Sequence, residues 1–179
     1  MRLFIAINFN EQIKNFIYDV IQKFKTYTLK GNFTLKDNLH LTLVFLGEIP
    51  YEKVEFIQDA MDSVNMDKFK LLIKGIGSFK RNGGDIFWIG VERNKNIFEL
   101  YNNLYEELTK RGFAIESREF KPHLTIGREV ALKDGFDKDA FADTIGQISV
   151  NVDKISLMKS ERINGKLVYT EIYAKPLGK

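Results

Sequence analysis

The chain has 179 residues, of which 44% are hydrophobic, so it can bury a stable core as one large domain or as two closely packed lobes. Cysteine is absent, which excludes disulfides, thiolate zinc sites and cysteine nucleophiles and is typical of a cytoplasmic protein. The 27 basic and 24 acidic residues give a formal charge of +3, which favours a small anionic site over a long basic surface for duplex nucleic acid.

Neither a membrane segment nor a secretory signal is expected from the sequence. No apolar run approaches the roughly 20 residues that cross a bilayer. Residues 1–8 turn polar too early to form the apolar centre of a signal peptide. We therefore expect a cytoplasmic, monomeric protein that does not act at a membrane.

The first half of the chain predicts strands and helices in alternation. Asn10 offers a helix N-cap directly before apolar residues at helical spacing, and Pro50 offers the start of a second helix. Gly31 and Asn32 interrupt the pattern after the first helix. The predicted strands cover residues 3–8, 39–46 and 69–79, and the predicted helices cover residues 13–24 and 50–64.

The second half predicts the same order of elements. A turn at residues 81–85 leads into it, and Asn164 with Gly165 predicts a later turn. One predicted strand begins near His123. The other predicted strands cover residues 86–91, 148–158 and 167–174, and the predicted helices cover residues 97–108 and 138–145.

The two halves are related by a constant offset in sequence. A strand, a helix and a histidine motif in the second half each follow their counterparts by 83 or 84 residues. This spacing predicts an internal repeat, with halves of roughly residues 1–83 and 84–179 that form a single two-lobed catalytic domain. We expect an α+β fold of two pseudo-twofold lobes, each made of antiparallel strands with helices packed outside, around a central cleft.

The only two histidines of the chain each begin the same short motif. His40 opens His-Leu-Thr-Leu and His123 opens His-Leu-Thr-Ile, 83 residues later. Since side chains alternate across a strand, each histidine shares one face with the threonine two positions on, while the aliphatic residues face the opposite layer. The repeat therefore predicts that both histidines, Thr42 and Thr125 face one cleft.

Two imidazoles and two hydroxyls at one point suit chemistry on a phosphodiester. With an ordinary pKa of about 6.5, one imidazole can take a proton from water while the other gives one to a departing oxygen. Thr42 and Thr125 can hold the phosphate oxygens, and Arg128 adds a guanidinium for the same purpose. Lys121 and Arg118 add positive charge just before the second motif. The symmetry of the motifs leaves open which imidazole is the acid.

A metal site is the main alternative for the two histidines. Zinc needs at least a third protein ligand, for which Glu48 and Glu119 are the candidates. No carboxylate recurs symmetrically beside both histidines, so we expect neither a metal nor a cofactor. Gly75 and Gly77 lack the spacing of a phosphate-binding loop and predict a strand bulge or turn instead.

The chain resembles the 2H phosphoesterase superfamily, and within it the RNA 2′,3′-cyclic phosphodiesterases, also called 2′-5′ RNA ligase-like proteins. The likeness rests on Asn-Leu-His-Leu-Thr-Leu-Val-Phe-Leu-Gly-Glu at residues 38–48 and on Phe-Lys-Pro-His-Leu-Thr-Ile-Gly-Arg at residues 120–128. The opening strand at residues 1–7 and the tail at residues 169–177 are also similar. The resemblance covers essentially the whole chain.

The resemblance implies hydrolysis of RNA 2′,3′-cyclic phosphate termini to 2′-phosphate ends without a metal. It implies that His40 is the proton donor to the leaving oxygen and His123 the proton acceptor that activates water. Thr42, Thr125 and Arg128 would bind the substrate phosphate. The implied partners are RNA 3′ ends or small cyclic-phosphate nucleotides, and reversible 2′-5′ ligation of RNA is implied as a side activity.

Two other functions stay open at this point. The first is a non-catalytic RNA-binding module on the same scaffold. The second is a phosphodiesterase for another 2′-5′ or cyclic nucleotide. The presence of both histidines and both threonines favours an enzyme.

Overall fold

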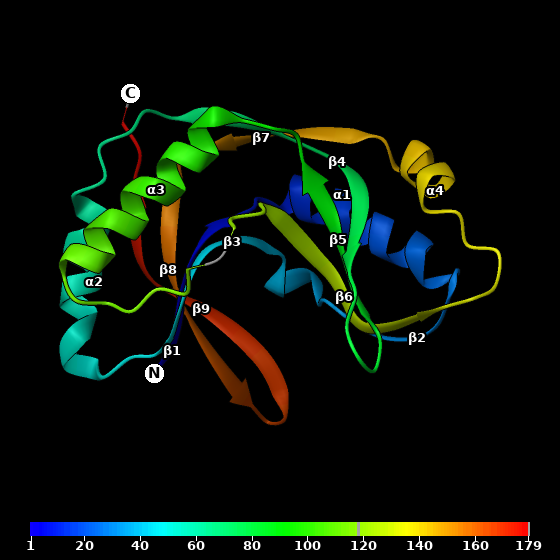
Figure 1. Ribbon diagram of the computed structural model, residues 1–179, viewed down its shortest axis with the longest axis horizontal. Helices are drawn as coiled ribbons and strands as arrows, with labels where there is room; N and C mark the ends of the chain where they lie inside the picture. The colour runs from blue at the N-terminus through cyan, green and yellow to red at the C-terminus, as the bar shows by residue number, and fades with distance from the viewer. Residues whose placement is uncertain (118, 179) are drawn as a thin grey trace.

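Two antiparallel sheets with helices packed against them make up the fold (Figure 1). The computed structural model describes residues 1–117 and 119–178, so Arg118 lies outside the described residues. The first sheet has the strand order β3 (His40–Glu48), β1 (Arg2–Asn8), β8 (Lys154–Ile163), β9 (Lys166–Pro176). The second sheet has the order β2 (Thr28–Phe33), β6 (His123–Leu132), β5 (Asp85–Val91), β4 (Phe69–Phe79), β7 (Gln147–Val152).

The two lobes exchange strands and helices between the halves of the chain. Strand β4 pairs with β5 in the second sheet, while β8 pairs with β1 in the first sheet. Helix α1 (Glu11–Lys25) packs against β2, β6 and β7, whereas α3 (Lys95–Lys110) packs against β3. Helices α2 (Val54–Asp62) and α4 (Lys138–Ile145) contact β9 and β4, respectively. The expected α+β fold of two lobes around a central cleft is confirmed.

Helix α1 shows how local sequence produces this layering. The side chain of Asn10 accepts a hydrogen bond from the backbone N–H of Ile13 at 3.0 Å, as expected for the N-cap. The buried face is one apolar stripe, formed by Ile13, Ile17, Val20, Ile21 and Phe24. Burial of each such side chain contributes about 1.5–3 kcal/mol, so the stripe fixes α1 against the second sheet.

The structure differs from the prediction at three places. Residues 28–33 form strand β2, which the sequence does not predict because Gly31 and Asn32 lie within it; β2 is an edge strand without a buried residue, so it lacks apolar alternation. Residues 148–158 are two strands, because the chain passes from the second sheet to the first at Asp153. The second helix begins with a 3-10 turn at Tyr51–Lys53, before α2.

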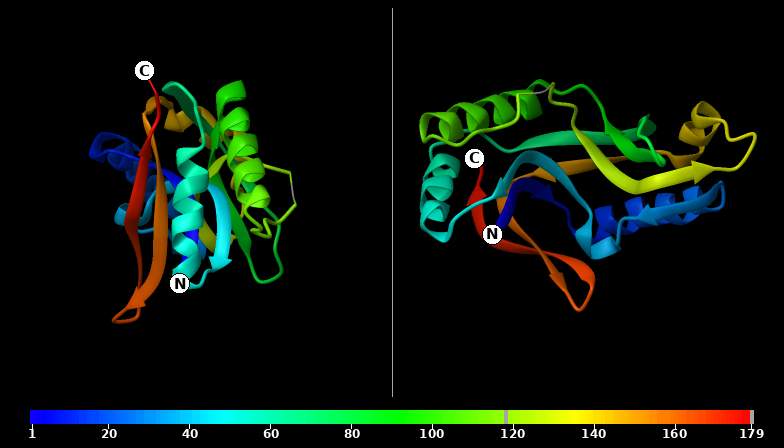
Figure 2. Two further views of the ribbon diagram at one scale, coloured as in Figure 1. Left: turned by 90° about the vertical axis from the view of Figure 1, so that its left-hand side faces the viewer. Right: turned by 60° about the horizontal axis from the view of Figure 1, so that its bottom comes forward.

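The hairpin of β8 and β9 projects beyond the rest of the first sheet (Figures 1 and 2). Its turn contains Asn164 and Gly165, both with positive φ, as a two-residue hairpin turn requires and as the sequence predicts. Near the turn, the Asn38 side chain donates a hydrogen bond to the carbonyl of Leu167 at 2.8 Å. This bond holds β9 beside the residues that lead into β3.

No helix within residues 1–117 and 119–178 has the length and apolar character needed to cross a membrane.

Candidate active site

Strands β3 and β6 lie against each other and carry the two histidine motifs to the same region. Leu41 and Leu124 are fully buried in the core, while His40 and His123 are half-buried on the opposite face of their strands. The predicted alternation of side chains is therefore present in both motifs. It turns the imidazoles away from the core and toward the space between the sheets.

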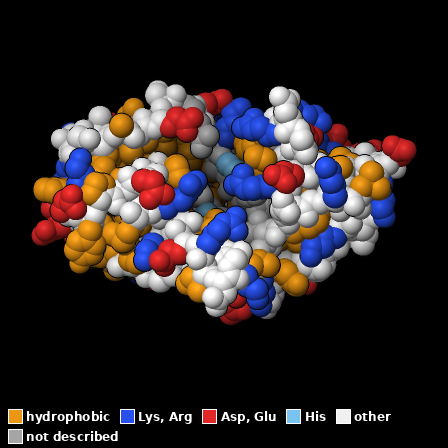
Figure 3. All heavy atoms as spheres, turned by 90° about the horizontal axis from the view of Figure 1, so that it is seen from below, with side chains coloured by type: hydrophobic (Ala, Val, Ile, Leu, Met, Phe, Trp, Pro, Cys, Tyr) orange, Lys and Arg blue, Asp and Glu red, His pale blue; other side chains and the backbone are white. Residues whose placement is uncertain are grey.

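A cleft of about 590 Å³ lies between the two sheets. Four of the five predicted site residues line it: Thr42, His123, Thr125 and Arg128. The fifth, His40, is joined to the cleft through a 2.9 Å hydrogen bond to Thr42. Figure 3 shows histidine side chains at the base of this hollow, with Lys and Arg side chains around its opening. The cleft is thus positively charged where an anion would enter.

The hydrogen bonds of His40 define its tautomer. Its Nδ1 lies 2.7 Å from the carbonyl oxygen of Asn38, which can only accept, so Nδ1 carries a proton. Nε2 is then the nitrogen that gains or loses a proton, and in the neutral ring it accepts a hydrogen bond from the Thr42 hydroxyl. His40 can therefore act as an acid or as a base through Nε2.

His123 is held in the same way. Its Nδ1 donates to the carbonyl oxygen of Lys121 at 2.6 Å, again two residues before the histidine. In both rings Nε2 is therefore the nitrogen that is left to exchange a proton. The two motifs present the same atom for proton transfer.

The surroundings of His40 change its pKa. Burial lowers the pKa of His40 below the ordinary histidine value, and the hydrogen bond to Asn38 opposes this effect. The positive charges of Arg128 and His123 lower the pKa of His40 further. This influence agrees with the contact between strands β3 and β6.

Aromatic side chains pack against both imidazoles. Phe4 and Tyr169 lie with their ring centres 4.9 and 5.1 Å from that of His40. Phe79 and Trp88 lie 5.1 and 6.0 Å from the ring of His123. The sequence predicts that some aromatic residues line the cleft, but these four come from strands that only the fold brings together.

Gly75 and Gly77 serve the packing of β4. Gly75 has φ of 74° beside a register shift between β4 and β5, which confirms the predicted strand bulge. At Gly77 a Cβ atom would lie 2.1 Å from the ring of Trp88, so the missing side chain gives the indole room beside His123.

The two carboxylates considered as metal ligands each form an ion pair. Glu48 lies 3.7 Å from the N-terminal amine, and Glu119, at the edge of the cleft, lies 3.2 Å from the ammonium group of Lys121. Within the described part of the chain, no cluster of three or more His, Cys, Asp or Glu residues is arranged to hold a metal ion.

Comparisons with known proteins agree with this arrangement. A family profile for the 2′-5′ RNA ligase superfamily matches residues 10–164. An RNA 2′,3′-cyclic phosphodiesterase from Thermotoga maritima is 33% identical over 176 residues, which cover 97% of this chain and 94% of that protein. A protein of the same name from Methanocaldococcus jannaschii is 42% identical over 129 residues, which cover 72% of this chain and 71% of that protein.

Solved structures extend the agreement to the fold. The crystal structure of Escherichia coli LigT in apo form superposes with a TM-score of 0.82 at 25% identity, covering 99% of this chain and 98% of that chain. The crystal structure of LigT complexed with 3′-AMP matches with the same values.

Two sheets that each carry one H-x-T-x motif to a shared cleft define a 2H phosphoesterase, an enzyme of the hydrolase class. The resemblance seen in the sequence is thereby confirmed. The chain belongs to the 2′-5′ RNA ligase superfamily.

Proposed function

We propose that this enzyme hydrolyses RNA 2′,3′-cyclic phosphate termini to 2′-phosphate ends without a metal. The observation that carries the proposal is that one cleft gathers Thr42, His123, Thr125 and Arg128, with His40 joined to it through Thr42. The curated relatives from T. maritima and M. jannaschii, both named RNA 2′,3′-cyclic phosphodiesterase, support the choice of substrate.

In the proposed reaction, Nε2 of His123 takes a proton from water as the water oxygen attacks phosphorus. The bond from phosphorus to the 3′ oxygen breaks, and protonated Nε2 of His40 gives its proton to that oxygen. The products are a 2′-phosphate and a 3′-hydroxyl. Each positioned proton transfer contributes about 10²–10⁴-fold to the rate.

The surroundings of His40 fit the role of the acid. A lowered pKa makes the protonated imidazole a stronger proton donor. When the anionic phosphate binds Arg128, it offsets the positive charge that disfavours protonation of His40, so the substrate itself promotes the active protonation state. Thr42 and Thr125 then donate hydrogen bonds to the non-bridging oxygens, where negative charge accumulates.

The test uses a short oligonucleotide ending in a 2′,3′-cyclic phosphate, incubated with the enzyme in excess chelator. We expect turnover, a bell-shaped pH profile of kcat/KM, and a loss of at least about 10²-fold in each of His40→Ala and His123→Ala. Circular dichroism of both variants controls for folding. Turnover that requires added metal, or that survives both substitutions, would refute the proposal.

Ligation would use the same groups with a different nucleophile. If the 5′-hydroxyl of a second RNA replaces water, His123 takes its proton as its oxygen attacks phosphorus. The bond from phosphorus to the 3′ oxygen breaks, His40 gives that oxygen a proton, and the product is a 2′-5′ linkage with a free 3′-hydroxyl. We propose ligation as a side activity of the enzyme. We also propose that the enzyme acts as a monomer. Adding an excess of 5′-hydroxyl RNA to the same assay should yield a joined product that also requires both histidines.

We also propose that residues 1–83 and 84–179 are an internal repeat that forms one catalytic domain. The exchange of strands between the sheets supports this view, since β4 of the first segment pairs with β5 of the second. Each segment expressed alone should then fail to melt cooperatively, because β1 lacks β8 and β5 lacks β4. A cooperative melt of either segment would contradict a single domain.

A further inference from the structure

We propose that Asn38 and Tyr169 form a device that holds the C-terminal hairpin over His40 and keeps water from one side of its imidazole. Asn38 contacts His40 through its backbone and β9 through its side chain, and Tyr169 covers the imidazole ring. Both act on the reaction only through His40, so they are positioning residues. Their role in catalysis rests on the proposed function.

Asn38 joins two parts of the molecule that are distant in sequence. Its carbonyl oxygen accepts the hydrogen bond from Nδ1 of His40 at 2.7 Å, while its amide donates to the carbonyl of Leu167 on β9 at 2.8 Å. Asn38 is 8% exposed, and a buried amide that bridges two elements is costly to disturb, since its partners lose their hydrogen bonds. One residue thus orients the imidazole and anchors the hairpin.

Tyr169 follows two positions after Leu167 on the anchored strand. Its ring lies edge-on to the imidazole of His40, at 5.1 Å between ring centres and 88° between planes. It packs in the same way against Phe4, at 5.0 Å and 74°. Tyr169 and Phe4 thus enclose the ring of His40 from β9 and β1, and water is excluded from that side of the imidazole.

Phe79 and Trp88 cover the ring of His123, but the residue two positions before this histidine differs from Asn38. The residue that corresponds to Asn38 is Lys121, which is exposed and whose ammonium pairs with Glu119 in the same loop. The C-terminal hairpin thus covers His40, and burial lowers the pKa of this imidazole.

Charged and titratable groups from several elements lie around His40 and the hairpin. Arg128 and His123 of β6 act on His40, Arg2 of β1 and Arg128 act on Tyr169, and Lys154 of β8 acts on Glu171 of β9. Burial raises the pKa of the Tyr169 phenol, so this group stays neutral in the range where His40 titrates. The carboxylate of Glu171 is bound by Asn8, Ser156 and Lys154. Replacing Tyr169 therefore changes the exposure of His40 without removing a charge.

The test measures histidine protonation directly, by NMR titration of the two imidazole Hε1 signals in the ligand-free protein. With only two histidines in the chain, His123→Ala assigns both signals. In Tyr169→Ala, we expect the titration midpoint of His40 to rise toward the ordinary value of about 6.5, because water reaches the ring. Tyr169→Phe should keep the wild-type midpoint, since it retains the ring.

Asn38→Ala tests the anchor separately. It removes the bond to Leu167 but keeps the backbone carbonyl that holds His40, so the midpoint of His40 should again rise as β9 loosens. Tyr173→Ala is the matched control, because Tyr173 lies on the same strand but donates its hydrogen bond to Asp62. This control should leave the His40 signal unchanged. Thermal melts identify any variant that is unfolded.

An unchanged His40 midpoint in folded Tyr169→Ala and Asn38→Ala would overturn the proposal, as would an equal shift in Tyr173→Ala. A failure of the proposed function looks different: the titrations behave as expected, but the cyclic-phosphate substrate is not hydrolysed. If both proposals hold, a substitution that shifts the NMR midpoint of His40 also shifts the pKa that His40 contributes to the pH profile of kcat/KM. A purely structural role would not produce this second shift.

Discussion

The indole ring of Trp88 lies directly over Gly77, on the neighbouring strand β4, and a Cβ atom at residue 77 would lie 2.1 Å from the ring. Trp88 in turn contacts Phe79 and His123, with ring centres 5.4 and 6.0 Å away. The position of His123 therefore depends on residue 77 having no side chain.

This contact predicts the effect of Gly77→Ala. The added methyl group must push the indole toward Phe79 or His123, and a displacement of about 1 Å at a catalytic group can cost about 10²-fold. We expect kcat/KM for a cyclic-phosphate oligonucleotide to fall by about 10- to 100-fold in a folded protein. Trp88→Leu added to Gly77→Ala should restore part of the activity by removing the clash. Full activity of Gly77→Ala would show that the indole does not position His123.

The lowered pKa of His40 predicts how stability depends on pH. In the unfolded chain His40 titrates near 6.5, while in the folded protein it titrates lower. As pH falls below about 6.5 the unfolded chain binds the proton first, so the free energy of unfolding falls until the pH has passed through the folded pKa. Urea denaturation at several pH values measures this. His40→Gln should reduce the loss between pH 7.5 and pH 5.5, and equal slopes in both proteins would contradict the burial of His40.

Replacing Arg128 should weaken the binding of the substrate phosphate. It lines the cleft with Thr125, and a charge-assisted hydrogen bond contributes about 1.5–3 kcal/mol. Arg128→Ala should therefore lower kcat/KM by about 10- to 100-fold, chiefly through KM if the contact is present in the ground state. Arg128→Lys should recover only part, because an ammonium group cannot bind two oxygens in a fixed plane. Steady-state kinetics at constant ionic strength separates the two parameters, and unchanged kinetics in Arg128→Ala would exclude this role.

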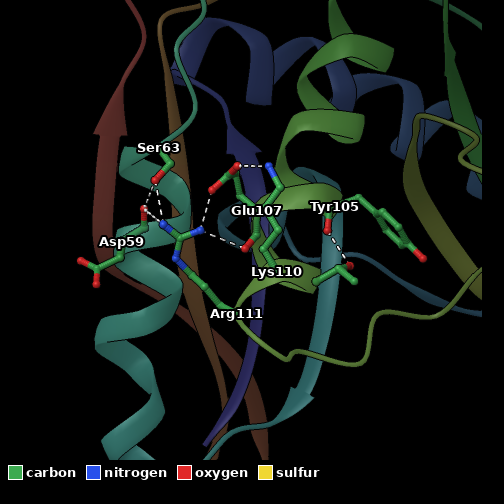
Figure 4. A network of polar contacts seen from close by, with 7 residues as sticks. Asp59, Ser63, Tyr105, Glu107, Lys110 and Arg111 are labelled. Atoms are coloured by element: carbon green, nitrogen blue, oxygen red, sulfur yellow. Dashed lines mark hydrogen bonds and ion pairs between the residues drawn. The ribbon is translucent and has the colours of Figure 1, made fainter.

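Replacing Arg111 should lower the stability of the protein without changing its activity. Its guanidinium joins α3 to α2: it donates to the Ser63 hydroxyl at 2.8 Å and also binds the carboxylate of Glu107 (Figure 4). Arg111→Met removes these bonds while keeping an aliphatic stem. Tm should fall by about 2–4 °C with kcat/KM unchanged, because the network lies on the helices and not among the cleft residues. A changed kcat/KM at a temperature where the variant is folded would contradict this separation.

The motifs were predictable from sequence because their signal is local. His40 and Thr42 are two positions apart on one strand, and Leu41 between them marks the buried face. Helix α1 was predictable for the same reason, since its cap and its apolar stripe lie within 15 residues. Such features need no knowledge of which strands become neighbours.

The groups that surround the histidines were not predictable, because they depend on pairings across the chain. Asn38 and Leu167 are 129 positions apart, and nothing near either residue indicates the other. The sheet to which a strand belongs is equally hidden, as the change of sheet at Asp153 shows. An edge strand such as β2 carries no buried pattern to detect.

The pairing of β1 with β8 has a consequence for the rate of folding. Arg2 lies opposite Ser160, so the interior of the first sheet forms only when segments from nearly opposite ends of the polypeptide meet. Closing so large a loop costs entropy before any contact compensates it, and such topologies fold slowly, on the order of milliseconds to seconds. Newly made molecules would therefore spend time with β1 as an unpaired edge, and during that interval they are open to aggregation.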